Sequence, residues 1–116
     1  MITFGDIKEP LEKIINSILT RKEKGESHPK DGCISKMNAE NIERASCNHL
    51  FDDYPELYGI TKPEAHRIRE YFNTGNYQHI LDLHNNFPEI IEKEDNEWLK
   101  NINNYRKTKG IEPIVL

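Results

Sequence analysis

An all-α fold, in a single domain spanning residues 1–116, is the architecture that this sequence predicts. Apolar residues recur at intervals of three and four in several segments, which is the spacing of a buried helical stripe. No segment alternates polar and apolar residues for long enough to indicate a β-strand. A chain of 116 residues also has the length of one ordinary domain. We therefore expect a compact bundle of about five helices with a short extended C-terminal tail.

The first helix is expected over residues 4–24. Thr3 and Asp6 can cap its start, and Gly25 can end it in the left-handed backbone conformation. Pro10 lies inside this span, so the helix either kinks there or begins with Pro10 at its first position. The stripe that should be buried consists of Phe4, Ile7, Leu11, Ile14, Ile15, Ile18 and Leu19.

An exposed loop and a second helix should follow. His28-Pro29 and Asp31-Gly32 are turn signals within residues 26–36. Asn38 is a favoured N-cap, which predicts a helix to about Phe51. Its inward face is expected to carry Ile42, Ala45, His49 and Leu50.

The clearest local signal starts the third helix. Pro55 and Gly59 bracket a short turn, and Thr61 and Glu64 then have the spacing of a capping box. The helix should run to Asn73 and stop at the following glycine.

Two further helices are predicted in the C-terminal third. Asn76 can cap a short helix that contains Ile80, Leu81 and Leu83. Pro88 is expected to begin a long helix that runs to about Lys109 and ends at Gly110. Residues 112–116 should pack back as an extended tail.

Composition narrows the classes of function. The formal net charge of −4 gives no overall attraction for nucleic acid or an anionic membrane. No apolar run approaches the roughly 18 residues of a membrane helix, and the N-terminus lacks the pattern of a signal peptide. We expect a cytoplasmic protein in which Cys33 and Cys47 are free thiols. Its richness in Asn, Lys and Ile is typical of AT-rich genomes, such as those of phages and mobile elements.

Binding to another protein is the predicted function. The sequence contains no phosphate loop, nucleophile elbow or metalloprotease motif, and we expect no cofactor. Small size and acidity suit an inhibitor, an immunity protein or a phage regulatory factor. Aromatic residues beside acidic ones make good anchors for a protein partner. The predicted surface consists of Asp52, Asp53, Tyr54, Glu56 and Tyr58, with Glu94, Asp95 and Glu97 as a second choice.

Nucleic-acid binding is the first alternative. Residues 59–69 resemble the turn and recognition helix of a helix-turn-helix protein, in which a capped helix carries basic residues to phosphates and bases. Pro55 departs from that pattern because it interrupts the helix expected before the turn. The resemblance implies that the readers are Lys62, His66, Arg67 and Arg69.

A zinc module or a ribonuclease is the second alternative. The possible zinc ligands are His28, Cys33, Cys47 and His49, although their spacing differs from the tight pairs of familiar zinc sites. Arg44 and His49 resemble the Arg-x4-His motif of HEPN ribonucleases, which are small all-α domains. The resemblance implies a His general base and an Arg that stabilises the transition state. On one helix the two side chains would diverge by about 140°, so such a site would need a homo-oligomer.

Overall fold

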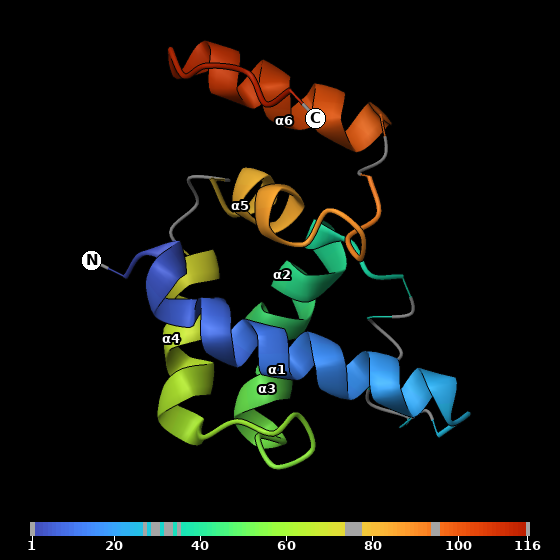
Figure 1. Cartoon of the computed structure of the whole chain (residues 1–116). Coiled ribbons are helices and arrows are strands. Elements are labelled where there is room, and N and C mark those ends of the chain that lie inside the picture. The colour runs from blue at the N-terminus through green and yellow to red at the C-terminus, as the bar shows by residue number, and fades with distance from the viewer. Residues whose placement is uncertain are drawn as a thin grey trace.

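The structure is a computed structural model and describes residues 2–26, 28, 31, 34, 36–73, 78–93 and 96–115, without the side chains of residues 96 and 98. These residues form six helices and no strand, which confirms the predicted all-α class (Figure 1). The helices are α1 (Phe4–Glu23), α2 (Ala39–Cys47), α3 (Leu50–Asp53), α4 (Lys62–Phe72), α5 (Gln78–Asn86) and α6 (Asn96–Thr108). None of them has the length and apolar character needed to cross a bilayer.

Helix α1 supplies the largest part of the core. Most of its predicted stripe is buried: Ile7, Leu11, Ile14, Ile15 and Ile18 are each at most 1% exposed, while Phe4 and Leu19 are partly buried. Burial of each such side chain stabilises the fold by about 1.5–3 kcal/mol. Helix α4 packs against both α1 and α2, while α5 packs against α2. Helix α6 lies beyond α5, on the side of the molecule away from α1 (Figure 1).

Both ends of α1 follow the prediction. The Thr3 amide donates to the Asp6 carboxylate at 2.9 Å, completing a capping box. This backbone hydrogen bond holds the pKa of Asp6 below its ordinary value. Gly25 has a φ of 70°, which is the left-handed conformation expected after the helix. Because α1 starts at Phe4, the alternative in which the helix begins at Pro10 is wrong.

The second predicted helix is broken near its end. Helix α2 ends at Cys47, and His49 has a φ of 63° before the short α3 begins. His49 is therefore exposed and does not lie on the inward face that we predicted. The break turns Phe51 and Asp52 toward the interior, where both are buried.

Helix α4 begins as predicted. The Thr61 amide donates to Glu64 at 3.0 Å, and the Glu64 amide donates back to the Thr61 hydroxyl at 3.4 Å. This capping box confirms the strongest local signal in the sequence. Asn73 follows the last helical residue, while the predicted stop at Gly75 and cap at Asn76 lie outside the described residues.

The last helix starts later than predicted. Residues 87–91 form turns, and α6 begins only at Asn96. Phe87 and Ile91 are both buried, and the Glu92 amide donates to the Met37 carbonyl at 2.7 Å. The turn therefore buries two apolar side chains and leads into a backbone hydrogen bond with the segment before α2. A straight helix from Pro88 would not make these contacts.

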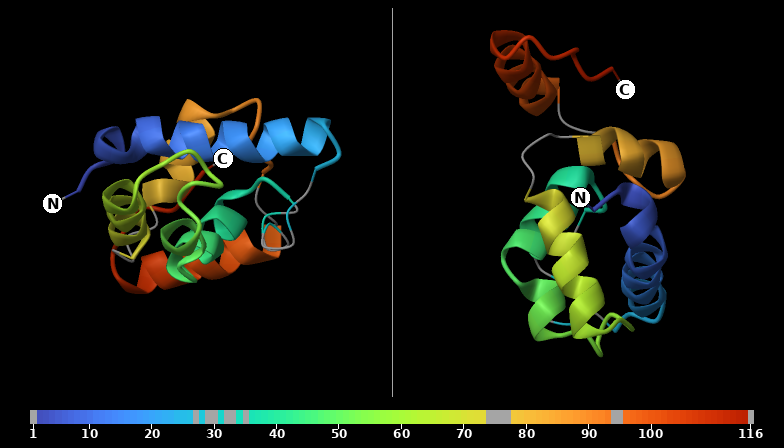
Figure 2. Two further views of the ribbon diagram at one scale, coloured as in Figure 1. Left: turned by 90° about the horizontal axis from the view of Figure 1, so that it is seen from below. Right: turned by 90° about the vertical axis from the view of Figure 1, so that its left-hand side faces the viewer.

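The C-terminal tail folds back along α6, as predicted (Figure 2). The Ile114 amide donates to Asn103 Oδ1 at 2.7 Å, and Asn103 Nδ2 donates to the Ile114 carbonyl at 3.0 Å. Ile114 itself is 2% exposed. One asparagine therefore satisfies both backbone groups of the residue that anchors the tail.

Candidate functional site

A rigid turn between α3 and α4 forms the centre of the candidate site. It spans residues 54–59, which we call the Tyr54–Gly59 turn. Its backbone closes on itself, since the amides of Tyr58 and Ile60 both donate to the Pro55 carbonyl, at 3.2 and 3.0 Å. Gly59 has a φ of 70°, a conformation that any other residue adopts only with strain. The turn therefore holds a defined shape before any partner binds.

A buried polar network fastens this turn to α1. The Tyr58 hydroxyl donates to Asp31 Oδ1 at 2.7 Å, and Arg21 Nη2 lies 2.9 Å from both oxygens of Asp31. Arg21 Nη1 also donates to the Leu57 carbonyl at 2.9 Å, and the guanidinium carbon lies 5.2 Å from the centre of the Tyr58 ring. Three side chains far apart in sequence thus hold the turn in place.

The electrostatics of this network centre on Asp31. Burial by itself would raise the pKa of Asp31, but the hydrogen bonds from Tyr58 and Arg21 outweigh it and lower the pKa. The carboxylate is therefore charged at neutral pH and paired with Arg21. The pair of Arg21 and Asp31 is not evident from the sequence, because residues ten apart show no local signal.

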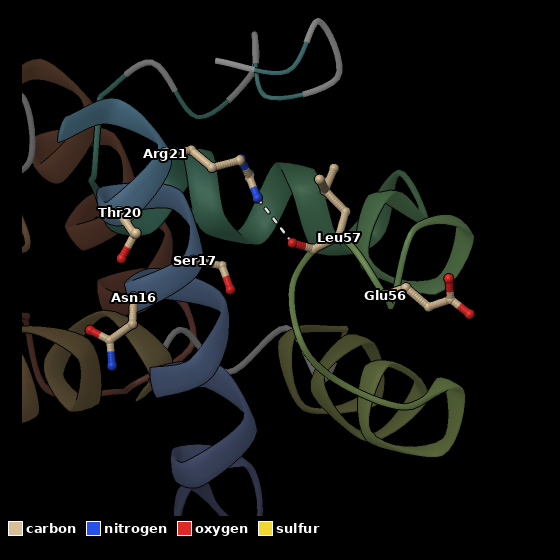
Figure 3. A pocket seen from close by; sticks show the side chains of 6 residues that line it. All are labelled: Asn16, Ser17, Thr20, Arg21, Glu56 and Leu57. Atoms are coloured by element: carbon tan, nitrogen blue, oxygen red, sulfur yellow. Dashed lines mark hydrogen bonds between the residues drawn. The ribbon is translucent and has the colours of Figure 1, made fainter. Parts of the chain in front are cut away.

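One groove lies between the turn and α1 (Figure 3). It has a volume of about 480 Å³, and α1 supplies polar side chains to its wall. Figure 3 shows Ser17 and Arg21 on the side of α1 that faces the turn, with Glu56 directed away from α1. The residues that line this α1 groove are Asn16, Ser17, Thr20, Arg21, Glu56 and Leu57.

A second groove lies on the other side of the turn. Its volume is about 600 Å³, and it reaches the first residue of α4. We call it the α4 groove, and its lining residues are Asp53, Tyr54, Pro55, Glu56, Leu57 and Lys62. Glu56 and Leu57 belong to both grooves, so the turn forms a ridge between them.

The structure divides the predicted protein-binding residues into two groups. Asp53 and Glu56 are exposed and Tyr54 is half-buried, and all three line the α4 groove. Asp52 and Tyr58 are buried at 6% and 0% exposure, so their inclusion in an accessible surface is a correction. Asp52 Oδ2 pairs with Arg69 of α4, and the Tyr58 hydroxyl donates to Asp31, so both side chains make their polar contacts inside the molecule. Of the second acidic choice, Glu97 is exposed, and Glu94 and Asp95 lie outside the described residues.

The basic residues of α4 also differ in their surroundings. Lys62, His66 and Arg67 are exposed. Arg69 instead reaches back to α3, where Nη1 lies 2.6 Å from Asp52 Oδ2. Because its guanidinium is held by a buried carboxylate, Arg69 departs from the predicted role of a residue that reads nucleic acid.

Two histidines, in addition to Arg69, lie close to the Asp52 carboxylate. His49 Nδ1 lies 3.3 Å and His66 Nε2 lies 3.7 Å from Asp52 Oδ2. Both histidine side chains are more than half exposed, whereas that of Asp52 is 8% exposed. The ion pair between Asp52 and Arg69 stabilises the contact between α3 and α4, and the two histidines lie beside it.

The geometry separates the two residues that resemble the HEPN motif. Arg44 lies on α2 and forms an ion pair with Glu40 at 2.7 Å. His49 lies beyond the end of that helix and contacts Asp52 and Arg69. The expectation that Arg44 and His49 share one helix is therefore wrong.

Of the four possible zinc ligands, the three that the structure describes make other contacts or lie apart. The His28 ring packs against Tyr54 with 6.0 Å between ring centres, and Cys33 lies outside the described residues. The Cys47 thiol donates to Asn73 Oδ1 at 3.1 Å, and burial followed by the charge of Glu43 raises its pKa. In the described part of the chain, no three His, Cys, Asp or Glu side chains are arranged to hold a metal ion.

Comparison of the chain with models of protein families, with curated proteins and with solved structures found no match.

Proposed function

We propose that this protein acts by binding another protein, and that the partner lies across the Tyr54–Gly59 turn. The observation that carries the proposal is the ridge itself, with a groove on each side and a backbone held by the Arg21–Asp31–Tyr58 network. A surface that is rigid before binding loses little conformational entropy when a partner docks. The partner would contact both the α1 groove and the α4 groove.

Charge indicates the chemistry of the partner. Asp53 and Glu56 are exposed, and neither forms an ion pair with any other residue that the structure describes. The buried carboxylates of Asp31 and Asp52, by contrast, are each paired with an arginine. Free carboxylates beside Tyr54 fit a partner segment that carries Lys or Arg next to an apolar side chain. Half-buried tyrosines at such places often supply a large share of the binding energy.

An inhibitory or regulatory role in the cytoplasm suits this kind of surface. An immunity protein or a phage regulatory factor works by occupying a site on a larger protein, and a small acidic domain with a preformed ridge can do so without chemistry of its own. We therefore propose further that the binding site on the partner protein is basic.

The test is affinity capture from the native host with matched variants. We expect wild-type protein to retain a partner that Tyr54→Ala/Glu56→Lys loses by at least about ten-fold, the scale expected for a central aromatic anchor. Glu89→Lys makes the same charge change at an exposed position outside both grooves and should keep the partner. Circular dichroism should show equal helicity in all three proteins. Equal retention by the groove variant and the control would contradict the proposal.

A second candidate, nucleic-acid binding, is favoured by one observation. Lys62, His66 and Arg67 are all exposed on α4, which follows a turn and a short helix. Fluorescence anisotropy with mixed duplexes and single strands at low salt tests it, because phosphate contacts are strongest there. Binding that Arg67→Glu abolishes would favour this candidate, and no rise in anisotropy would eliminate it.

A further inference from the structure

A separate cavity lies at the opposite end of the molecule from the Tyr54–Gly59 turn. It has a volume of about 240 Å³ and opens between the end of α5, the turns of residues 87–93 and the C-terminal tail. Figure 1 shows α5 and the tail on the far side of α1 and α2 from that turn. A space of this size is smaller than a typical cavity for drug-sized molecules, so any ligand would be small.

Three segments far apart in sequence hold the walls of this cavity in place. The turn at residues 87–91 is anchored by buried Phe87 and by the bond from the Glu92 amide to the Met37 carbonyl. The paired hydrogen bonds between Asn103 and Ile114 anchor the tail, so that the next residue, Val115, lines the cavity. The cavity is therefore a product of the folded structure and not of one flexible loop.

The polar groups of the cavity come from His84, Asn85 and Lys93. His84 Nε2 is buried, and it has no hydrogen-bond partner among the residues that the structure describes. A buried ring nitrogen without a partner is unfavourable, so a ligand that supplies one gains affinity. His84 is also one of the residues that line the cavity, so its ring lies beside any occupant.

The rest of the lining is apolar and is formed by Leu81, Pro88, Ile91 and Val115. Ile91 is 5% exposed, whereas Val115 is 80% exposed. An apolar wall beside a cation and a hydrogen-bonding ring suits a molecule with one charged end and one apolar end. The positive charge of Lys93 disfavours a ligand whose charged end is a cation.

We propose that this cavity binds a small organic anion, a carboxylate with a short apolar chain. The carboxylate lies between Lys93 and His84, with the Asn85 amide as a further donor, and the chain lies against Leu81 and Ile91. The proposal is independent of the protein partner, since it uses no residue of either groove.

The charge balance of His84 gives this binding a specific signature. Burial, followed by the charge of Lys93, lowers the pKa of His84 in the free protein. An anion seated beside the ring favours the protonated imidazole, so binding should raise the pKa of His84. Burial of an apolar chain alone would not raise it.

The test is an NMR titration of the full chain with hexanoate. We expect saturable shifts of the amides of residues 81–93 and of Val115, with a Kd of about 1 mM for a ligand of this size. The pKa of His84, followed through its ring protons, should rise in the presence of hexanoate. N-acetyl-leucine serves as a second probe, because the same carboxylate chemistry occurs at the end of a peptide, and binding of either probe supports the proposal.

Matched ligands and variants separate this proposal from adventitious contact. Hexylamine has the same chain and the opposite charge, and should not bind. His84→Leu and Lys93→Gln should each weaken hexanoate by about ten-fold, while Lys100→Gln on exposed α6 should leave it unchanged. Absence of saturable shifts with both carboxylates would overturn the proposal, as would equal affinity for hexanol or no effect of the two variants.

Discussion

Replacement of Asp31 by Asn tests the network that gives the candidate site its shape. Asp31 is 7% exposed, and it accepts from Tyr58 at 2.7 Å and from Arg21 at 2.9 Å. The substitution keeps the size of the side chain and removes its charge. It leaves the Arg21 guanidinium, whose side chain is 15% exposed, without a counter-ion.

We expect Asp31→Asn to lower the free energy of unfolding by about 3 kcal/mol at pH 7. Removal of one partner from a buried ion pair costs about 3–5 kcal/mol, and Arg21 retains its bond to the Leu57 carbonyl, which places the loss at the lower end. Tyr58→Phe removes a single hydrogen bond to a charged group and should cost about 2 kcal/mol. Either loss is a large part of the roughly 5–15 kcal/mol that stabilises an ordinary domain.

Urea denaturation measures this loss as a lower midpoint with an unchanged slope. A double-mutant cycle of Asp31→Asn with Tyr58→Phe should show that the two losses are not additive, because both remove the same contact. The pH dependence has a definite sign. The folded pKa of Asp31 lies below its ordinary value of 3.8, so its contribution is present above that value and is lost as pH falls through the folded pKa. Asp31→Asn should therefore lose less stability than wild type as the pH falls below 3.8.

Asp53→Asn is the matched control, since it makes the same chemical change at an exposed carboxylate. We expect it to change the free energy of unfolding by less than about 0.5 kcal/mol. If Asp31→Asn cost no more than Asp53→Asn, the network would not hold the turn in place.

Three further predictions concern other fixed contacts of the fold; the first two are measured by urea or thermal unfolding, and the third by hydrogen exchange. Gly59→Ala should lower the free energy of unfolding by about 1–2 kcal/mol, because φ is +70° there and the left-handed conformation strains an alanine. An unchanged free energy of unfolding would contradict this. Arg69→Met should cost about 3 kcal/mol, since it leaves buried Asp52 without its arginine, and an unchanged midpoint would show that Asp52 needs no such partner. Asn103→Leu removes both hydrogen bonds to Ile114, so the tail amides should exchange with deuterium at least about ten-fold faster while those of α4 keep their protection.

Part of the candidate site was predictable from residues close together in sequence. Asp53, Tyr54 and Glu56 were predicted as a surface from their type and spacing, and they line the α4 groove. The α1 groove was not predicted, because Asn16, Ser17 and Thr20 look like an ordinary polar helix face until the turn packs beside them. The cavity at His84 likewise needs the tail and the turn at residues 87–91 to meet.

Local chemistry in the sequence determined the class of the fold and several of its boundaries. The stripe of α1, the capping box of Thr61 and Glu64, and the left-handed glycine at Gly25 each depend on residues within a few positions of one another. Interactions of this range are present in any conformation that forms the helix, so the sequence pattern reveals them.

Tertiary structure alone decided where helices break and which polar residues are buried. The chain breaks between α2 and α3 at Asn48 and His49, with no proline or glycine to mark the break, while Asp52 pairs with Arg69 across seventeen positions. Tyr58 is buried because Asp31 and Arg21 come to it from other segments. A buried polar group is tolerated only when a partner is supplied, and the partner's position is a property of the whole fold.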